Sequence, residues 1–268
     1  MSHNVISMTD SNYFFNGIFL METRKKVNAH FIVYGPDLSK DEIAKLTKHN
    51  MEYRKVDQNT FNTKMQSLKF KYLLDSESIY TTYLDWDTFI VKDWTYDVFE
   101  CKKFNLGITV RNKMIQKGCL RAFANGGVIF AQNHSYQREN TLTILEMMLN
   151  TISKGKCKLL PEYDEIWKTL EIGRKPGKTH FRTDYRWWCD QVILSSLVLY
   201  YIRKYKKNSI PDYLEYEFNK TIIGMFNCDK YNCISAHPSY NDNNYYIGHL
   251  KKAGRVKTFG KDVTKEKL

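Results

Sequence analysis

Two aspartates separated by one residue, Asp85 and Asp87, have apolar segments on both sides, at 79–84 and 88–91. In an extended strand, residues two apart share a face, so both carboxylates can point the same way. Carboxylates bind hard divalent cations such as Mg2+ or Mn2+, and a cation with open positions can bind both phosphates of a diphosphate. The pattern therefore indicates a metal site that neutralises the charge developing on a departing diphosphate.

The alternative for these two aspartates is a surface turn. A chain of this length contains roughly one Asp-x-Asp by chance, so the motif alone is weak. Burial of both apolar flanks would leave two carboxylates half-buried without a partner, which is costly unless a cation binds them. The flanks therefore favour the metal site.

The elements that must position these residues follow from the hydrophobic periodicity. Helices are expected at 41–49, 63–74, 138–152 and 190–205. Strands are expected at 4–8, 29–34, 52–56, 79–84, 88–91, 104–110, 127–131, 213–218, 232–236 and 245–250. Strands alternating with helices favour an α/β fold, in which helices cover both faces of a mostly parallel sheet and ligands gather at the carboxyl ends of its strands.

The chain has 268 residues, 43% of them hydrophobic, which is enough for the core of one large α/β domain. We therefore expect a single domain over residues 1–268. Residues 173–186 collect Gly, Pro and basic side chains and are expected to form an exposed loop, and residues 251–268 form a basic tail.

The formal net charge is +12, from 41 Lys and Arg against 29 Asp and Glu. Such an excess implies attraction to phosphate-rich partners, namely nucleotides, nucleic acid or an anionic membrane surface. A Lys-rich solvated surface is the alternative. The charge thus indicates a class of partner but no reaction.

Three absences in the sequence narrow the class of protein. The six cysteines form no CxxC pair and no cluster at zinc spacing, so neither a disulfide framework nor a zinc site is indicated. No apolar run is long enough to span a bilayer, and residues 1–10 lack the features of a signal peptide. We therefore expect a cytoplasmic protein.

The segment 83–93 (YLDWDTFIVKD) resembles the metal-binding DxD segment of GT-A fold glycosyltransferases, particularly the glycogenin-like and galactosyltransferase-like retaining enzymes. Three more segments are similar to landmarks of that family and follow in its order: 124–130 (ANGGVIF), 190–191 (DQ) and 247–252 (IGHLKK). Together the four cover most of the chain.

The resemblance implies a GT-A (Rossmann-like) fold, a mostly parallel mixed sheet flanked by helices in a single domain. Residues 1–110 would form its nucleotide-binding half and residues 111–250 its acceptor half. It also implies a hexosyltransferase that takes a sugar from a nucleotide-diphosphate sugar with Mn2+ or Mg2+.

The resemblance implies Asp85, Asp87 and His249 as metal ligands, with Asp85 also beside the donor. A lone histidine near a strand end is otherwise more often structural, and His237 is a competing candidate for the third ligand. Lys251 and Lys252, with Arg255 beyond them, would supply charge to the β-phosphate, unless this run is a solvated tail. The family's glycine lies nearer to the histidine than Gly254 does, and its closing Lys-Pro-Trp is missing here.

Asn125, Gly126 and Gly127 are expected at the donor sugar. Asn125 offers a donor and an acceptor for hydroxyl groups, and the glycines let backbone approach a ligand, although they fit a β-bulge or tight turn equally well. Asp190 and Gln191 would contact the sugar or its reacting face by resemblance. From the sequence alone, Asp190 is as well explained as a helix cap.

Thr9, Asp10 and Tyr13 follow the first strand, where enzymes of this family bind the base and ribose. Tyr13 could stack on a base or pack against the sheet. Lys64 and, less strongly, Lys69 would contact the diphosphate or the base by resemblance.

The acceptor stays open between a saccharide, a glycolipid, a protein and a modified nucleic acid, and the positive charge favours an anionic one. Trp187 and Trp188 could stack on a sugar or base, or anchor the following helix. Retention is expected by resemblance, whereas an inverting enzyme would need a carboxylate base such as Asp184 or Asp190. The rival functions are a non-catalytic nucleic-acid-binding protein and a degenerate transferase that only binds donor.

Overall fold

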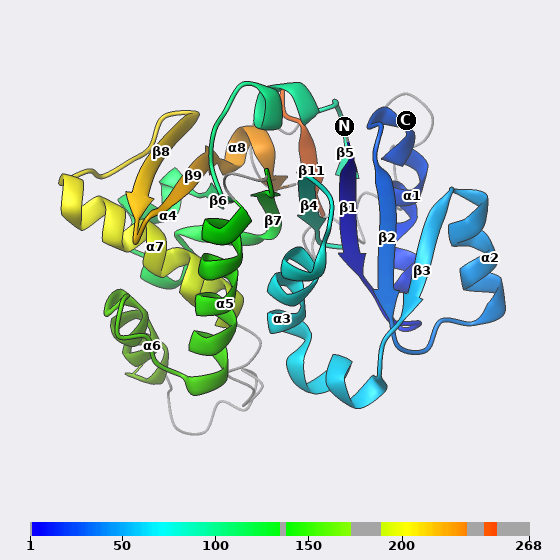
Figure 1. Ribbon diagram of the computed structural model, residues 1–268, viewed down its shortest axis with the longest axis horizontal. Helices are drawn as coiled ribbons and strands as arrows, with labels where there is room; N and C mark the ends of the chain where they lie inside the picture. Colours follow the sequence, from blue (N-terminus) through cyan, green and yellow to red (C-terminus); the bar gives the residue numbers. More distant parts are fainter. Residues whose placement is uncertain (1, 135–137, 173–188, 235–243, 251–268) are drawn as a thin grey trace.

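The computed structural model describes residues 2–134, 138–172, 189–234 and 244–250 (Figure 1). Its centre is an eight-stranded sheet in the order β3-β2-β1-β4-β7-β6-β9-β8. The strands are β1 His3–Met8, β2 His30–Gly35, β3 Met51–Lys55, β4 Tyr80–Leu84, β6 Leu106–Val110, β7 Ala124–Gln132, β8 Tyr213–Phe218 and β9 Thr221–Asn227. Neighbours are parallel at β1/β2, β2/β3, β1/β4 and β6/β9, and antiparallel at β4/β7, β6/β7 and β8/β9. The predicted α/β fold with a mostly parallel mixed sheet is confirmed.

Helices cover both faces of this sheet. The helices are α1 Ile18–Thr23, α2 Lys40–Lys48, α3 Gln58–Asp75, α4 Asn112–Gln116, α5 Arg138–Lys154, α6 Glu162–Ile172, α7 Cys189–Tyr205 and α8 Cys228–Tyr231, with the short helical segments η1 Phe14–Gly17, η2 Arg24–Lys26, η3 Tyr96–Glu100 and η4 Leu120–Ala122. Side chains of α3, α5 and α7 pack with Ile6 on one face, and side chains of α1 and α2 pack with Val5 on the other. Successive side chains of β1 therefore pack into two separate cores, one on each face of the sheet.

The starts of two helices are fixed by local side chains. Ser39 and Glu42 form a capping box at α2, and the Asp57 carboxylate accepts a hydrogen bond from the Thr60 amide at α3. The cap at Asp57 explains why α3 begins before residue 63, where the apolar period alone placed its start.

A second, three-stranded sheet joins the C-terminal segment to the residues after β4. It contains β10 Cys233–Ile234, β11 Ile247–His249 and β5 Thr88–Ile90, in the order β10-β11-β5. β11 pairs antiparallel with β5, so that His249 lies opposite Thr88. The chain therefore folds back onto the segment that follows the two aspartates.

Several elements were not predicted from the sequence, including α1, α6 and β9. β9 joins β8 through Asn219 and Lys220, which have φ angles of 47° and 62°. Two residues at positive φ form the tight hairpin turn that suits the twist of paired strands. Asn219 was a usable turn signal, but Lys220 at positive φ is uncommon and gives none.

In the part of the chain that the structure describes, none of the helices has the length and apolar character needed to cross a bilayer. The predicted loop at 173–186 and the basic tail at 251–268 lie outside the described residues.

Candidate metal and donor site

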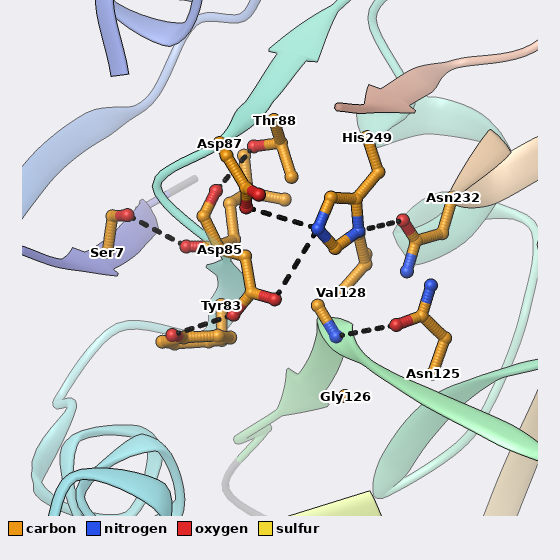
Figure 2. Close-up of polar contacts among 12 residues, drawn as sticks. Ser7, Tyr83, Asp85, Asp87, Thr88, Asn125, Gly126, Val128, Asn232 and His249 are labelled. Carbon is orange, nitrogen blue, oxygen red and sulfur yellow. Dashed lines mark hydrogen bonds and ion pairs between the residues drawn. The ribbon is translucent and has the colours of Figure 1, made fainter. Parts of the chain in front are cut away.

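Asp85 and Asp87 lie where β4 ends, in the turn that leads into β5 (Figure 2). The Asp85 carbonyl accepts hydrogen bonds from the Thr88 amide at 3.1 Å and from the Thr88 hydroxyl at 2.8 Å. The two acids therefore occupy a hydrogen-bonded turn, and the expectation that they continue an extended strand was wrong. Their carboxylates still converge, because the turn folds Asp87 back beside Asp85.

The side chain of Trp86, between the two acids, anchors this turn in the core on the side away from the two carboxylates. Its indole is 2% exposed, and Nε1 donates to the Phe14 carbonyl at 2.8 Å. A Cβ at Gly17 would lie 1.9 Å from the Trp86 ring, so only glycine fits there. With the tryptophan held in the core, the flanking carboxylates are directed away from it.

His249 completes a cluster with the two acids. Its Nε2 lies 3.1 Å from Asp87 Oδ1 and 3.7 Å from Asp85 Oδ2 (Figure 2). The His249 and Asp87 side chains are 1% and 5% exposed, whereas that of Asp85 is 27% exposed. One ligand atom from each residue lies within 4.8 Å of the others, so the described residues bring together the predicted ligands Asp85, Asp87 and His249.

This donor set fits a divalent cation. Two carboxylate oxygens and one imidazole nitrogen suit Mn2+, which accepts both ligand types, and leave coordination positions for other oxygens. A Cβ at Gly127 would lie 2.5 Å from His249 Cε1 and 2.8 Å from Asp85 Oδ2. The absence of a side chain at residue 127 therefore leaves the space that the cluster occupies.

Lys69 of α3 is a buried cation behind this cluster. Its Nζ donates to Asp190 Oδ2 at 2.7 Å, to the Gly126 carbonyl at 3.1 Å and to Asp85 Oδ1 at 3.2 Å. Burial lowers the pKa of Lys69, but the carboxylates of Asp190 and Asp85 outweigh it and raise that pKa well above its ordinary value. Lys69, the weaker of the two predicted lysines, thus links the metal cluster to α7.

Tyr83, which lies in β4 two residues before Asp85, supports the carboxylate of Asp85. Its hydroxyl lies 3.1 Å from Asp85 Oδ1, and Lys69 Nζ lies 5.0 Å from its ring centre. Burial raises the pKa of Tyr83 well above its ordinary value, so the phenol stays a neutral donor. Oδ1 of Asp85 is therefore held by Tyr83 and Lys69, while Oδ2 points to His249.

Asp190 and Gln191 lie in the first turn of α7, which begins at Cys189. Asp190 is 3% exposed and meets Lys69, and Gln191 Nε2 lies 3.5 Å from the Ala124 carbonyl. Asp190 is therefore within the helix, where a negative charge is favoured by the helix dipole, and it is also the buried partner of Lys69.

The segment Asn125–Gly127 forms an irregular start of β7, where the pairing with β6 shifts between Ile108 and Thr109. A Cβ at Gly126 would lie 2.5 Å from Asp190 Oδ2. Asn125 Oδ1 accepts from the Gly127 amide at 3.3 Å, and its Nδ2 lies 3.8 Å from Cys228 Sγ. The β-bulge that the sequence left as one alternative is present here, and the approach of this backbone to a donor sugar stays a prediction.

The end of β1 lies at the same edge of the sheet. Asp10 Oδ1 accepts from the Tyr13 amide at 2.7 Å, which closes a turn after the strand, and Thr9 is buried. The Tyr13 hydroxyl donates to Asp87 Oδ2 at 3.0 Å, and its ring packs against the core formed by α1 and α2. Tyr13 therefore touches the metal cluster directly.

Several predicted site residues are not described. The side chain of Lys64 in α3 lies outside what the structure describes, as do Asp184, Trp187, Trp188, His237, Lys251, Lys252 and Arg255.

No model of a protein family matches this sequence, and no curated protein matches it either. A solved structure of the galactosyltransferase LgtC, in complex with donor and acceptor sugar analogs, matches with a TM-score of 0.51 and 12% identity, over 92% of this chain and 86% of that chain. The chain has the GT-A glycosyltransferase fold. An active-site mutant of LgtC gives a TM-score of 0.49 at 12% identity over 92% and 86% of the two chains, and a glycosyltransferase involved in glycosylation of the major capsid of PBCV-1 gives 0.47 at 10% identity over 96% of both.

Within this GT-A fold, the cluster of Asp85, Asp87 and His249 lies at the carboxyl end of β4, the strand between β1 and β7 (Figure 2). Two groups at the site, Tyr83 and Asn232, were not found from the sequence. Tyr83 had a signal, because it lies only two residues before Asp85 in the sequence. Asn232, whose Oδ1 lies 3.1 Å from His249 Nδ1, had none, since this contact depends on the second sheet.

Proposed function

We propose that the protein is a metal-dependent glycosyltransferase that moves a hexosyl group from a nucleotide-diphosphate sugar to an acceptor, with retention of configuration. The observation that carries the proposal is the convergence of Asp85, Asp87 and His249 at the carboxyl end of a central strand. Ligands of open α/β sheets bind at this edge.

The metal-binding residues of this proposal are Asp85, Asp87 and His249, with Mn2+ preferred to Mg2+ because one ligand is imidazole. A divalent cation bound there would neutralise the charge that develops on the diphosphate as the sugar departs. Lys251 and Lys252 are proposed to add charge at the β-phosphate. Their basic character and their place in the sequence, two and three residues after the end of β11, support this role.

The other site residues have proposed roles on either side of the metal. Thr9, Asp10, Tyr13 and Lys64 bind the nucleotide, and Asn125, Gly126 and Gly127 line the donor sugar. Asp190 and Gln191 contact the sugar at its reacting face. The Lys69 contact with both Asp190 and Asp85 supports this arrangement, because one buried cation holds the proposed reacting face beside the metal ligands.

We propose that residues 1–268 form one domain, with a nucleotide half, an acceptor half and a basic tail. We also propose that the protein is cytoplasmic, which six free thiols support. The acceptor is proposed to carry carbohydrate or negative charge, in keeping with the net charge of +12.

A screen of nucleotide sugars for release of free nucleoside diphosphate in the presence of MnCl2 tests the activity. We expect one donor to be hydrolysed, EDTA to stop its hydrolysis, and Asp87→Asn to lower the rate by on the order of 100-fold or more. Asp75→Asn is the matched control, because Asp75 is an exposed partner of Lys71 on α3. Binding of a nucleotide sugar without hydrolysis would indicate a degenerate transferase, and retention of activity in Asp87→Asn would overturn the metal mechanism.

The stereochemical part of the proposal has its own test. NMR assignment of the anomeric centre in the transfer product, once an acceptor is known, should give the configuration of the donor. The opposite anomer would show inversion and would require a carboxylate base such as Asp190.

A further inference from the structure

Asn232, between α8 and β10, lies behind the imidazole of His249. Its side chain is 0% exposed, and its Oδ1 lies 3.1 Å from His249 Nδ1 (Figure 2). Nε2 on the other side of the ring faces Asp85 and Asp87. Which ring nitrogen carries a proton therefore decides whether His249 can present a lone pair to a cation.

The contacts of Thr109, which is also buried, fix the orientation of the Asn232 amide. Thr109 Oγ1 lies 2.9 Å from the Asn125 carbonyl oxygen and 3.4 Å from that of Val128. A carbonyl oxygen can only accept, so the hydroxyl proton of Thr109 is used there. Thr109 Oγ1 must then accept from Asn232 Nδ2, which lies 3.2 Å away.

With Nδ2 committed to Thr109, the amide oxygen of Asn232 faces His249. An amide oxygen also accepts only, so Nδ1 of His249 is the donor in their hydrogen bond. The neutral ring then has its lone pair on Nε2, 3.1 Å from Asp87 Oδ1. A rotated amide would instead require a proton on Nε2, in the place where a cation must bind.

We propose that Asn232 is a positioning residue, which fixes the orientation and the Nδ1–H tautomer of His249 so that Nε2 is available to a divalent cation. This inference rests on the metal site of the proposed function. The same hydrogen-bonded series runs through Thr109 to the carbonyls of Asn125 and Val128, so the histidine ligand is coupled to the bulge of β7.

Mn2+ affinity measured by the EPR signal of the free ion tests the role of Asn232. Asn232→Leu, which removes the acceptor, should weaken Mn2+ binding by about 10- to 100-fold. Asn232→Asp keeps an acceptor for the Nδ1 proton and should bind Mn2+ at least about ten times more tightly than Asn232→Leu. Equal losses in both variants, or no loss in Asn232→Leu, would overturn the proposal.

Asn105→Leu is the matched control for loss of a buried asparagine. Asn105 is 1% exposed and joins β6 to β9 and α5 through the Ile222 amide and the Thr141 hydroxyl. Its replacement should lower stability without changing Mn2+ affinity. A loss of affinity in Asn105→Leu as large as that in Asn232→Leu would show a general effect of destabilisation and would count against the inference.

The tautomer can be measured on the unmutated protein, so the test does not depend on a variant folding. Long-range 1H–15N spectra of the ring-labelled, MgCl2-saturated protein at mildly alkaline pH should show His249 with a protonated Nδ1 and an unprotonated Nε2. A protonated Nε2 in a neutral ring would contradict the proposal.

Asp85→Asn distinguishes failure of the metal site from failure of the positioning role of Asn232. If Asp85→Asn weakens Mn2+ binding and Asn232→Leu does not, the positioning role fails while the metal site stands. If neither variant weakens it, the metal site fails, and the proposed function fails with it.

Discussion

Lys69 is a buried cation that two carboxylates share. Its ammonium group meets carboxylates from two different parts of the chain, Asp85 and Asp190, and its side chain is 7% exposed. A buried charge that loses its partner is far more costly than an exposed one. The stability of the site therefore depends on the balance of charge around one buried nitrogen.

Lys69→Met should lower the free energy of unfolding by about 3–5 kcal/mol, because it leaves the buried carboxylate of Asp190 without its cation. Lys71→Met, on the same helix but in an exposed pair with Asp75, should cost less than about 1 kcal/mol. Urea denaturation measures both. In a double-mutant cycle, Asp190→Asn should recover part of the loss. Equal effects at Lys69 and Lys71 would show that the buried pair has no special role.

His3 gives the protein a pH-dependent stability that is independent of the metal site. Its Nε2 lies 3.0 Å from Thr82 Oγ1, and its ring packs against Phe99 and Trp94. Burial lowers the pKa of His3 from its usual 6.5 to about 4. Between these two pH values the unfolded chain binds the proton that the folded chain excludes.

Because the folded pKa is the lower one, the contribution of His3 is present above pH 6.5 and is lost as the pH falls towards about 4. The loss is roughly 3 kcal/mol over this window. Urea unfolding of His3→Phe, which keeps an aromatic ring there, should show a weaker pH dependence than the wild type in that window. Identical pH profiles for the two proteins would contradict this account.

At the scale of elements, the site is built where a tight turn, a bulged strand and a short third strand meet. The turn after β4 supplies Asp85 and Asp87, β11 supplies His249, and the start of β7 supplies the space between them. Gly127 lies where these elements come together, since a Cβ there would collide with two of the three ligands, His249 and Asp85.

Gly127→Ala should therefore weaken Mn2+ binding by at least about tenfold, because the new methyl group displaces His249 or Asp85. Gly107→Ala in β6 is the control. The three atoms nearest to its Cβ would belong to Phe226, Phe104 and Phe130, at 2.8 to 3.0 Å, so we expect a loss of about 1–3 kcal/mol in stability with Mn2+ affinity unchanged. EPR titration of both variants measures this, and unaltered affinity in Gly127→Ala would refute the packing argument.

The elements themselves were predicted unevenly. β1, β2, β4, α5 and α7 agreed closely with their apolar periods, because each buries one consistent face or is wholly buried. β5 and β11 have only 3 residues each, and their pairing depends on segments far apart in sequence. Each could be predicted as a strand from its own residues, but the pairing of one strand with the other could not.

At the scale of the whole molecule, the metal ligands come from distant parts of the chain. Asp85 and Asp87 lie in the first half, and His249 lies close to the end of the described residues. A cation bound by both segments binds the folded state selectively, so binding must stabilise the fold.

MnCl2 at about 100 times its Kd should therefore add roughly 2.7 kcal/mol to the free energy of unfolding. For a chain of this size, that corresponds to a rise in Tm of about 5–10 °C. Differential scanning calorimetry should show the rise in the wild type and in Asp75→Asn but not in Asp87→Asn. An equal rise in Asp87→Asn would place the stabilising ion elsewhere.

The sequence by itself determined the α/β alternation and the Asp-x-Asp segment with its apolar flanks. These two features depend on local period and on side-chain chemistry, which are present before the chain folds. His249 was a candidate ligand only through the family resemblance, with His237 as its competitor. Only the tertiary structure decided that Lys69 meets Asp190, 121 residues away, that Tyr13 donates to Asp87, 74 residues away, and that Asn232 supports His249. Such contacts depend on how the helices and both sheets pack, because packing, and not residue type, brings one buried donor to one particular acceptor.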